Sequence, residues 1–160
     1  DGVLVMEQGS CTLTANKIHH NFHSGIEVRD HGKVTASENA VHNNNFGVIV
    51  ARKSTGTLAN NRICGNFLTG VEISKCDYEQ EQEQEDGGGL PQVTENVISH
   101  NLESGIKIWH RGGALLSGNQ VDANLDEVRL TPRSRRHTRF GEVEEGEARG
   151  LLGNNKVREL

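Results

Sequence analysis

Residues 61–73, Asn61-Arg62-Ile63-Cys64-Gly65-Asn66-Phe67-Leu68-Thr69-Gly70-Val71-Glu72-Ile73, contain the unit that decides the fold. The unit reads Asn-x-Ile-x-x-Asn-x-x-x-Gly-Val-x-Ile, so apolar residues alternate with other residues after the glycine. Alternation with a period of two is typical of a β-strand, and Asn and Gly are typical of turns. The unit therefore predicts short strands separated by tight corners.

The same unit recurs along the chain. A glycine followed by alternating apolar residues occurs at five positions, with steps of 23, 22, 23 and 35 residues: Gly2, Gly25, Gly47, Gly70 and Gly105. The first asparagine of the unit recurs as Asn16, Asn39, Asn61, Asn96, Asn119 and Asn155, and the second as Asn21, Asn44, Asn66, Asn101 and Asn124. Because several sets of equivalent residues share one period, the chain contains an internal repeat.

A period of 22 to 23 residues selects the architecture. Helical repeats are longer, at about 33 residues or more, and the pattern of leucine-rich repeats is absent. Three short strands per period predict an all-β, right-handed parallel β-helix of about six coils, each stacked about 4.8 Å from the next. The apolar residues after each glycine, such as Val71 and Ile73, are expected to point inward. A narrow lumen of this kind accounts for a hydrophobic content of only 33%.

The asparagine and glycine columns predict how the corners are made. Asparagine tolerates the left-handed conformation, so we expect it at sharp corners, and stacked asparagines can hydrogen-bond from coil to coil. Glycine is expected to supply the positive φ that another corner needs. Large apolar side chains follow the second asparagine and are expected to form a matching stack: Phe22, Phe46, Phe67, Leu102 and Leu125.

Two segments lengthen the period and are predicted to be loops inserted in a single β-helix domain over 1–160. The first, 76–90, is acidic and is expected to be disordered. The second, 131–149, is basic and then acidic. Its basic run, Arg133 to Arg139, is either an anion-binding or nuclear-import patch or a solvated loop that pairs with the acidic segment. Loops on a solenoid often mark the binding face.

Composition limits the function classes. A net charge of −5 argues against a general nucleic-acid binder, and no apolar run has the ~20 residues of a membrane span. Three cysteines do not form a disulfide framework, so a cytoplasmic protein is expected, with the nucleus as a further location. The chain opens in mid-repeat, so we expect a fragment of a longer protein.

The repeat resembles the parallel β-helix repeats of carbohydrate-binding and sugar-hydrolase type. Among intracellular proteins it most resembles the C-terminal solenoid of the F-box only protein 10 and 11 family, as in residues 61–73 and 96–106. The resemblance implies a part of a cullin-based ubiquitin ligase that recruits the substrate protein. It also implies an F-box outside this chain that binds the Skp1 adaptor.

An enzyme that cleaves or binds polysaccharides is the alternative. The outer column of the glycine-led strands contains Glu27 and Glu72, which are separated by Ile49. Two coil steps place these acids about 10 Å apart, near the range of inverting glycosidases, but no second acid supports either one. The histidines and cysteines show no metal-ligand spacing. We therefore assign no catalytic residue, cofactor or metal ligand.

The most informative surface residue is Trp109. Ile108 should point inward, so Trp109 should face outward, flanked by Lys107, His110 and Arg111 and with Arg129 one coil further on. Exposed Trp and Arg are typical of interface hot spots. We hypothesise that these five residues bind a partner protein and prefer an acidic or phosphorylated segment. The alternative is that Trp109 packs under one of the inserted loops.

Overall fold

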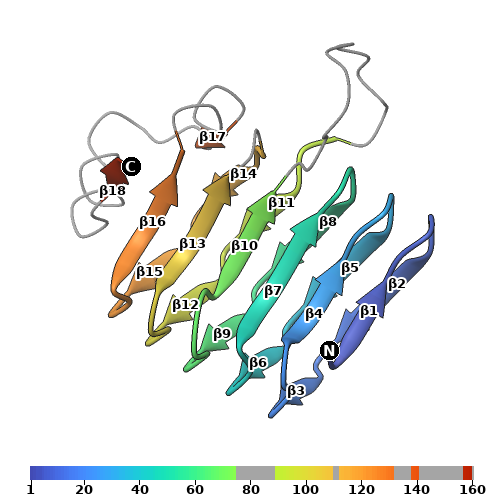
Figure 1. Cartoon of the computed structure of the whole chain (residues 1–160), viewed down its shortest axis with the longest axis horizontal. Helices are drawn as coiled ribbons and strands as arrows, with labels where there is room; N and C mark the ends of the chain where they lie inside the picture. Colours follow the sequence, from blue (N-terminus) through green and yellow to red (C-terminus); the bar gives the residue numbers. More distant parts are fainter. Residues whose placement is uncertain (75–88, 110–111, 132–137, 141–156, 160) are drawn as a thin grey trace.

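The computed structural model describes residues 1–74, 89–109, 112–131, 138–140 and 157–159. Its strands lie in three parallel sheets that run the length of the molecule (Figure 1). Most of the two predicted inserts, and with them the disorder expected for the first, lies outside the described residues. Among the described residues, none forms a helix with the length and hydropathy of a membrane span.

Each complete coil contributes one strand to each sheet, because neighbours within a sheet differ by three in strand order from β1 to β17. The first sheet contains β1 (Val3–Val5), β4 (Ser24–Val28), β7 (Phe46–Ala51), β10 (Val71–Ser74), β13 (Ser104–Trp109), β16 (Asp126–Leu130) and β18 (Val157–Glu159). The second contains β2 (Ser10–Thr14), β5 (Lys33–Ser37), β8 (Thr55–Ala59), β11 (Gln92–Thr94), β14 (Leu115–Ser117) and β17 (Arg139–Phe140). The third contains β3 (Lys17–His19), β6 (Ala40–His42), β9 (Arg62–Cys64), β12 (Val97–Ser99) and β15 (Gln120–Asp122).

The predicted aliphatic columns form the core. In the first sheet Ile26 pairs with Val48, Val48 with Val71, and Val71 with Ile106. These four side chains are at most 1% exposed. Corresponding files of Val, Ile and Leu from the other two sheets complete one hydrophobic cluster along the axis. The parallel β-helix and its inward-facing residues are thus confirmed, with five complete three-strand coils and a further coil that begins at β16.

Two asparagine ladders join the coils at the corners on either side of the third sheet. Asn66 is representative: its Oδ1 accepts hydrogen bonds from Asn44 N at 3.1 Å and from Asn44 Nδ2 at 3.2 Å. Its own Nδ2 donates to Asn101 Oδ1 at 2.9 Å. Asn61 bonds to Asn96 in the same way, although 35 residues separate the two. The predicted ladder is therefore confirmed, and the first insert leaves it unbroken.

The corner conformation differs from the prediction. The positive φ belongs to the residue before each ladder asparagine, as in His20 (58°), Asn43 (55°) and His100 (56°), and not to the ladder asparagine itself. The ladder asparagine directs its amide to the next coil, as Asn66 does to Asn101. Its predecessor therefore makes the turn.

The repeat glycines also act differently from the prediction, since none of them has a positive φ. Their role is close approach. A Cβ on Gly70 would lie 2.7 Å from Asn101 Nδ2, 2.7 Å from the Gly105 carbonyl oxygen and 2.8 Å from Ile98 Cγ2. Glycine is required here because the ladder and the next coil already fill the space of a side chain.

We predict that Asn66→Ala lowers the free energy of unfolding by about 3 kcal/mol, since it removes the buried side-chain hydrogen bonds to Asn44 and Asn101 and leaves the Asn44 N–H without its acceptor. Urea unfolding followed by circular dichroism measures this change. The matched control is Asn45→Ala, which lies next to the ladder and should change stability by less than about 0.5 kcal/mol. Equal effects of the two substitutions would contradict the structural role of the ladder.

Gly70→Ala should strongly destabilise or prevent folding, because backbone and a buried amide surround the added methyl group. Gly89→Ala is the control, since a Cβ there meets no atom within 4 Å. Thermal unfolding midpoints of the two variants and the parent chain test this expectation. A Gly70→Ala variant as stable as Gly89→Ala would show that close approach does not explain the glycine column.

Candidate partner-binding surface

The outward-facing side chains of the first sheet form the predicted column. Glu27 pairs with Ile49, Ile49 with Glu72, Glu72 with Lys107, and Lys107 with Arg129. The strand spacing of the sheet therefore brings Lys107 and Arg129 together, as their shared repeat position predicts. The register does not depend on the length of the insert between β10 and β11.

Trp109 lies at the end of β13, beside Ser74 of β10. Its indole Nε1 donates a hydrogen bond to Glu72 Oε1 at 3.1 Å, and Lys107 Nζ lies 5.1 Å from the centroid of the indole ring. The side chain is partly buried. Contacts on two sides thus hold one aromatic surface in a fixed position, and the separation of Lys107 from the ring is suitable for a cation–π interaction. The other two predicted residues, His110 and Arg111, lie outside the described residues.

Glu103 joins the cations of this surface. Its Oε1 lies 3.1 Å from Lys107 Nζ and 3.7 Å from Arg129 Nη1, and its Oε2 accepts a hydrogen bond from Thr69 Oγ1 at 2.9 Å. We call Glu72, Glu103, Lys107, Trp109 and Arg129 the Trp109 patch. Two carboxylates balance its two cations, so the patch carries little net charge. The basic character from which a preference for an acidic segment was inferred is therefore largely cancelled.

The pKa of Glu103 follows from opposing effects. Partial burial acts to raise it, but hydrogen bonds from Lys107 and Thr69, together with the positive charges of Lys107 and Arg129, hold the pKa below the usual value of 4.5. Glu103 is absent from the sequence-based site because it lies in the turn before β13. The sequence did offer one indication of this contact, because Glu103 precedes Lys107 by four residues and carries the opposite charge.

The two acids considered for sugar cleavage are both engaged. Glu27 lies 3.4 Å from His23 Nδ1 and 3.6 Å from Arg29 Nε. Glu72 is 8% exposed and accepts the bond from Trp109. Each carboxylate therefore already has a partner within the protein. In a glycosidase, the corresponding carboxyl groups act as a proton donor and as a base or nucleophile.

One group of the described residues has ligand atoms spaced as in a metal site: Asp1, His23 and Glu27, within 4.8 Å of one another. Asp1 Oδ1 accepts hydrogen bonds from His23 Nδ1 at 2.9 Å, Ser24 N at 3.2 Å and Ser24 Oγ at 2.7 Å. These bonds explain the arrangement without an ion. Of the cysteines, Cys11 and Cys64 are free thiols on different strands, and Cys76 lies outside the described residues.

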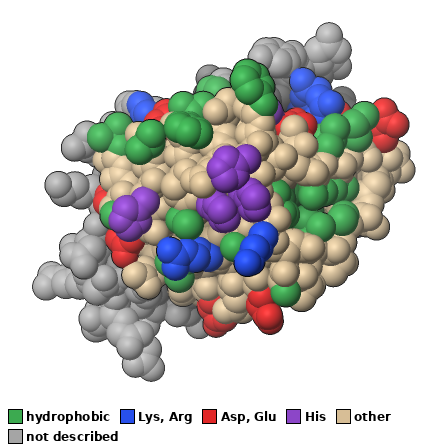
Figure 2. Space-filling model, turned by 90° about the horizontal axis from the view of Figure 1, so that it is seen from below, with side chains coloured by type: hydrophobic (Ala, Val, Ile, Leu, Met, Phe, Trp, Pro, Cys, Tyr) green, Lys and Arg blue, Asp and Glu red, His purple; other side chains and the backbone are tan. Residues whose placement is uncertain are grey.

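A histidine cluster on the third sheet is a feature that the sequence analysis missed. His19 and His42 stack with ring centroids 4.9 Å apart, and His20 Nδ1 lies 2.7 Å from His19 Nδ1. Figure 2 shows these histidine side chains gathered on one face, beside lysine and arginine side chains. The signal was present in the sequence, because His19 and His42 are 23 residues apart and so occupy the same position in successive coils.

We predict that Glu103→Gln removes a pH-dependent part of the stability. A carboxylate whose folded-state pKa is depressed stabilises the fold above its unfolded pKa of about 4.5 and loses that effect as the pH falls through the folded pKa. The difference in urea midpoint between the parent chain and Glu103→Gln should therefore be present at pH 7 and shrink progressively below about pH 4.5. A difference that stays constant with pH would contradict the proposed ion network.

Comparisons with known proteins agree with this architecture at the level of family. Residues 1–129 match the family described as right handed beta helix region. Searches of curated proteins and of solved structures gave no match. The matched residues span five complete coils and most of β16, which is well over half of the chain. The chain therefore belongs to the right-handed beta helix family.

Proposed function

We propose that this β-helix is a non-catalytic module that recognises a partner protein through the Trp109 patch. The observation that carries the proposal is the fixed position of Trp109, which Glu72 and Lys107 hold at the end of β13. A partly buried aromatic ring that is already ordered loses little conformational entropy on binding. Such residues dominate the energy of protein interfaces.

The arrangement around Trp109 supports protein recognition for a second reason. Lys107 and Arg129 are 18% and 27% exposed and share Glu103, so their side chains are ordered but still reachable from solvent. A surface with an aromatic centre and a rim of paired charges resembles the usual anatomy of a protein interface. His110 and Arg111 follow Trp109 in the sequence, and we propose that they also contribute to binding.

We further propose that the partner is a substrate of a cullin-based ubiquitin ligase, in the cytoplasm or nucleus. The support is the resemblance of the repeat to the solenoid of the F-box only protein 10 and 11 family. In that arrangement an F-box elsewhere in the parent protein binds Skp1, and the β-helix holds the substrate close to the ligase. A polysaccharide-binding or polysaccharide-cleaving module is the competing function.

Trp109→Ala should weaken binding of the partner by about 30-fold, as expected for the loss of a hot spot worth about 2 kcal/mol. The measurement is quantitative affinity purification from cell lysate with the parent chain, Trp109→Ala and Arg129→Ala as baits. The matched control is Leu4→Ala, which removes an exposed apolar side chain at the far end of the same outer column. The control should retain the proteins that the Trp109 variant loses.

Other outcomes separate the parts of the proposal. Retention of the same proteins by Trp109→Ala and Arg129→Ala would refute the patch. If the captured proteins bind through Trp109 but their ubiquitination is unchanged after depletion of the parent protein, the ligase assignment fails and recognition stands. Binding or cleavage of pectin-like polymers, lost in Glu27→Gln and Glu72→Gln, would favour the polysaccharide function instead.

A further inference from the structure

The outer surface of the third sheet has a different charge from the Trp109 patch. Its first coils carry Lys17, His19 and His20 from β3 and the corner after it, His42 from β6 and Arg62 from β9. In the described part of the chain, neither Lys17 nor Arg62 is in an ion pair with a carboxylate. Asp122 lies on the same sheet, but two strands beyond Cys64, and accepts a hydrogen bond from Gln120.

This basic surface lies on a protein with a net charge of −5. Burial acts first to lower the pKa of His42, and electrostatic repulsion by His19, His20, Arg62 and Lys17 lowers it further. Of these neighbours, Arg62 and Lys17 carry permanent positive charges. Their field favours an anion on this surface.

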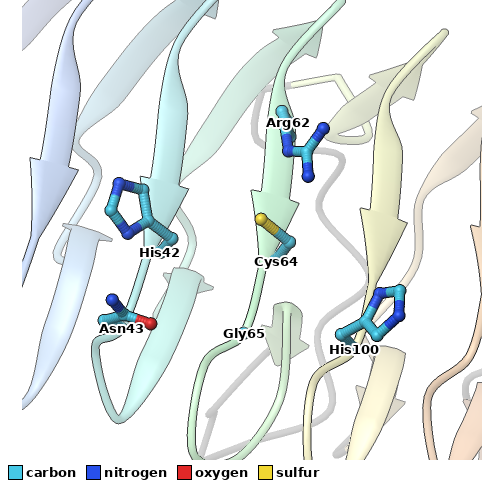
Figure 3. Close-up of a pocket in the computed structure, with 6 residues that line it drawn as sticks. All are labelled: His42, Asn43, Arg62, Cys64, Gly65 and His100. Carbon is cyan, nitrogen blue, oxygen red and sulfur yellow. The ribbon is translucent and has the colours of Figure 1, made fainter.

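A shallow hollow of about 340 Å³ opens on this surface. Figure 3 shows His42 and Asn43 on one side of it, His100 on the other, and Arg62 above Cys64 and Gly65 on the strand between them. The hollow exists because Gly65 stands in the corner position that His20, Asn43 and His100 hold in other coils. With no side chain at that position, the space between the two imidazoles is open.

We propose that this hollow binds the phosphate group of a phosphorylated segment of the partner protein. The proposal rests on the proposed function, in that it names the chemistry of the protein that the module recognises. His42 and His100 are carried by coils two steps apart, which is about 9.6 Å and leaves room for a tetrahedral oxyanion between their rings. Arg62 supplies the planar guanidinium donors that match phosphate oxygens.

The surface beside the hollow indicates that the ligand is a protein segment and not a free ion. Beyond the ladder asparagines, the next residue in four coils is a large apolar side chain that is at least 60% exposed: Phe22, Phe67, Leu102 and Leu125. We call these residues the apolar stripe. In the remaining coil, the residue after the ladder asparagine Asn44 is Asn45. Phe46 lies one residue later and aligns with Ser24 of the preceding coil. The expected column is therefore interrupted at Asn45 and does not include Phe46.

The stripe and the hollow are close neighbours. Gly65 and Phe67 flank the single ladder residue Asn66, and His100 and Leu102 flank Asn101 in the same way. Hydrophobic side chains lie along an edge of the face that carries the histidines in Figure 2. An extended segment can therefore place a phosphorylated residue over Gly65 and an adjacent apolar residue on the stripe. Exposed apolar surface of this kind commonly marks a protein-binding site.

The test uses fluorescein-labelled peptides with a phosphoserine flanked by leucines, the same peptide without phosphate, and a phosphoserine peptide flanked by glycines. Fluorescence anisotropy with the intact chain measures binding. The phosphorylated leucine peptide should bind best, and Arg62→Gln and His100→Gln should each weaken it at least 5-fold. Phe67→Ser should weaken the leucine peptide but leave the glycine peptide unchanged.

The matched control for charge is Arg52→Gln, since Arg52 is an exposed cation at a different corner, 3.6 Å from Asp30. It should retain full binding, and circular dichroism should show that all variants keep the parent fold. Equal binding of the unphosphorylated peptide, or equal losses in Arg62→Gln and Arg52→Gln, would overturn the proposal. Tighter Arg62-dependent binding of a single-stranded oligonucleotide of the same charge would also overturn it.

The two proposals fail separately. The peptide titration does not involve Trp109, so absence of phosphate-dependent binding removes the phosphate site but leaves recognition through the Trp109 patch. Conversely, loss of the patch in the affinity purification leaves the Arg62-dependent binding of the phosphopeptide unchanged.

Discussion

The hydrogen bond between asparagine side chains of successive coils is the constraint on which the rest of this structure depends. Each interior ladder amide, such as that of Asn66, accepts from the coil before it and donates to the coil after it, and these amides are mostly buried. A displaced coil would leave several buried polar groups without partners, at a cost of about 1–3 kcal/mol for each group. The ladders therefore fix the register of all three sheets. Because the register is fixed, residues far apart in sequence, such as Glu72 and Lys107, meet on one surface.

Repetition made the fold predictable from the sequence, and irregularity limited the prediction of the site. The aliphatic columns and both ladders follow from positions that recur every 22 or 23 residues. The corner geometry did not follow, because the residue that turns, such as His20 or Ala123, varies from coil to coil and has no signature. Glu103 also lies outside the repeated pattern, and its role depends on the particular side chains of Thr69, Lys107 and Arg129.

The two outer surfaces show how one scaffold can carry different chemistry. On the first sheet, acids and bases pair with one another around Trp109. On the third sheet, histidines occupy equivalent positions in successive coils and lie beside cations with no acidic partner among the described residues. In both cases the stacking of coils at about 4.8 Å sets the separation of the side chains. What differs is only which residues the sequence places at solvent-facing positions.

The side-chain bond from Asn61 Nδ2 to Asn96 Oδ1 is 3.0 Å long, the same length as the bond from Asn96 to Asn119, which are only 23 residues apart. The stacking of the coils is therefore independent of the length of the segment between β10 and β11. Segments at that corner can be lengthened, shortened or exchanged over evolutionary time while the stacked framework stays intact. The corner is accordingly a natural position for grafting a foreign peptide or a reporter domain onto this solenoid.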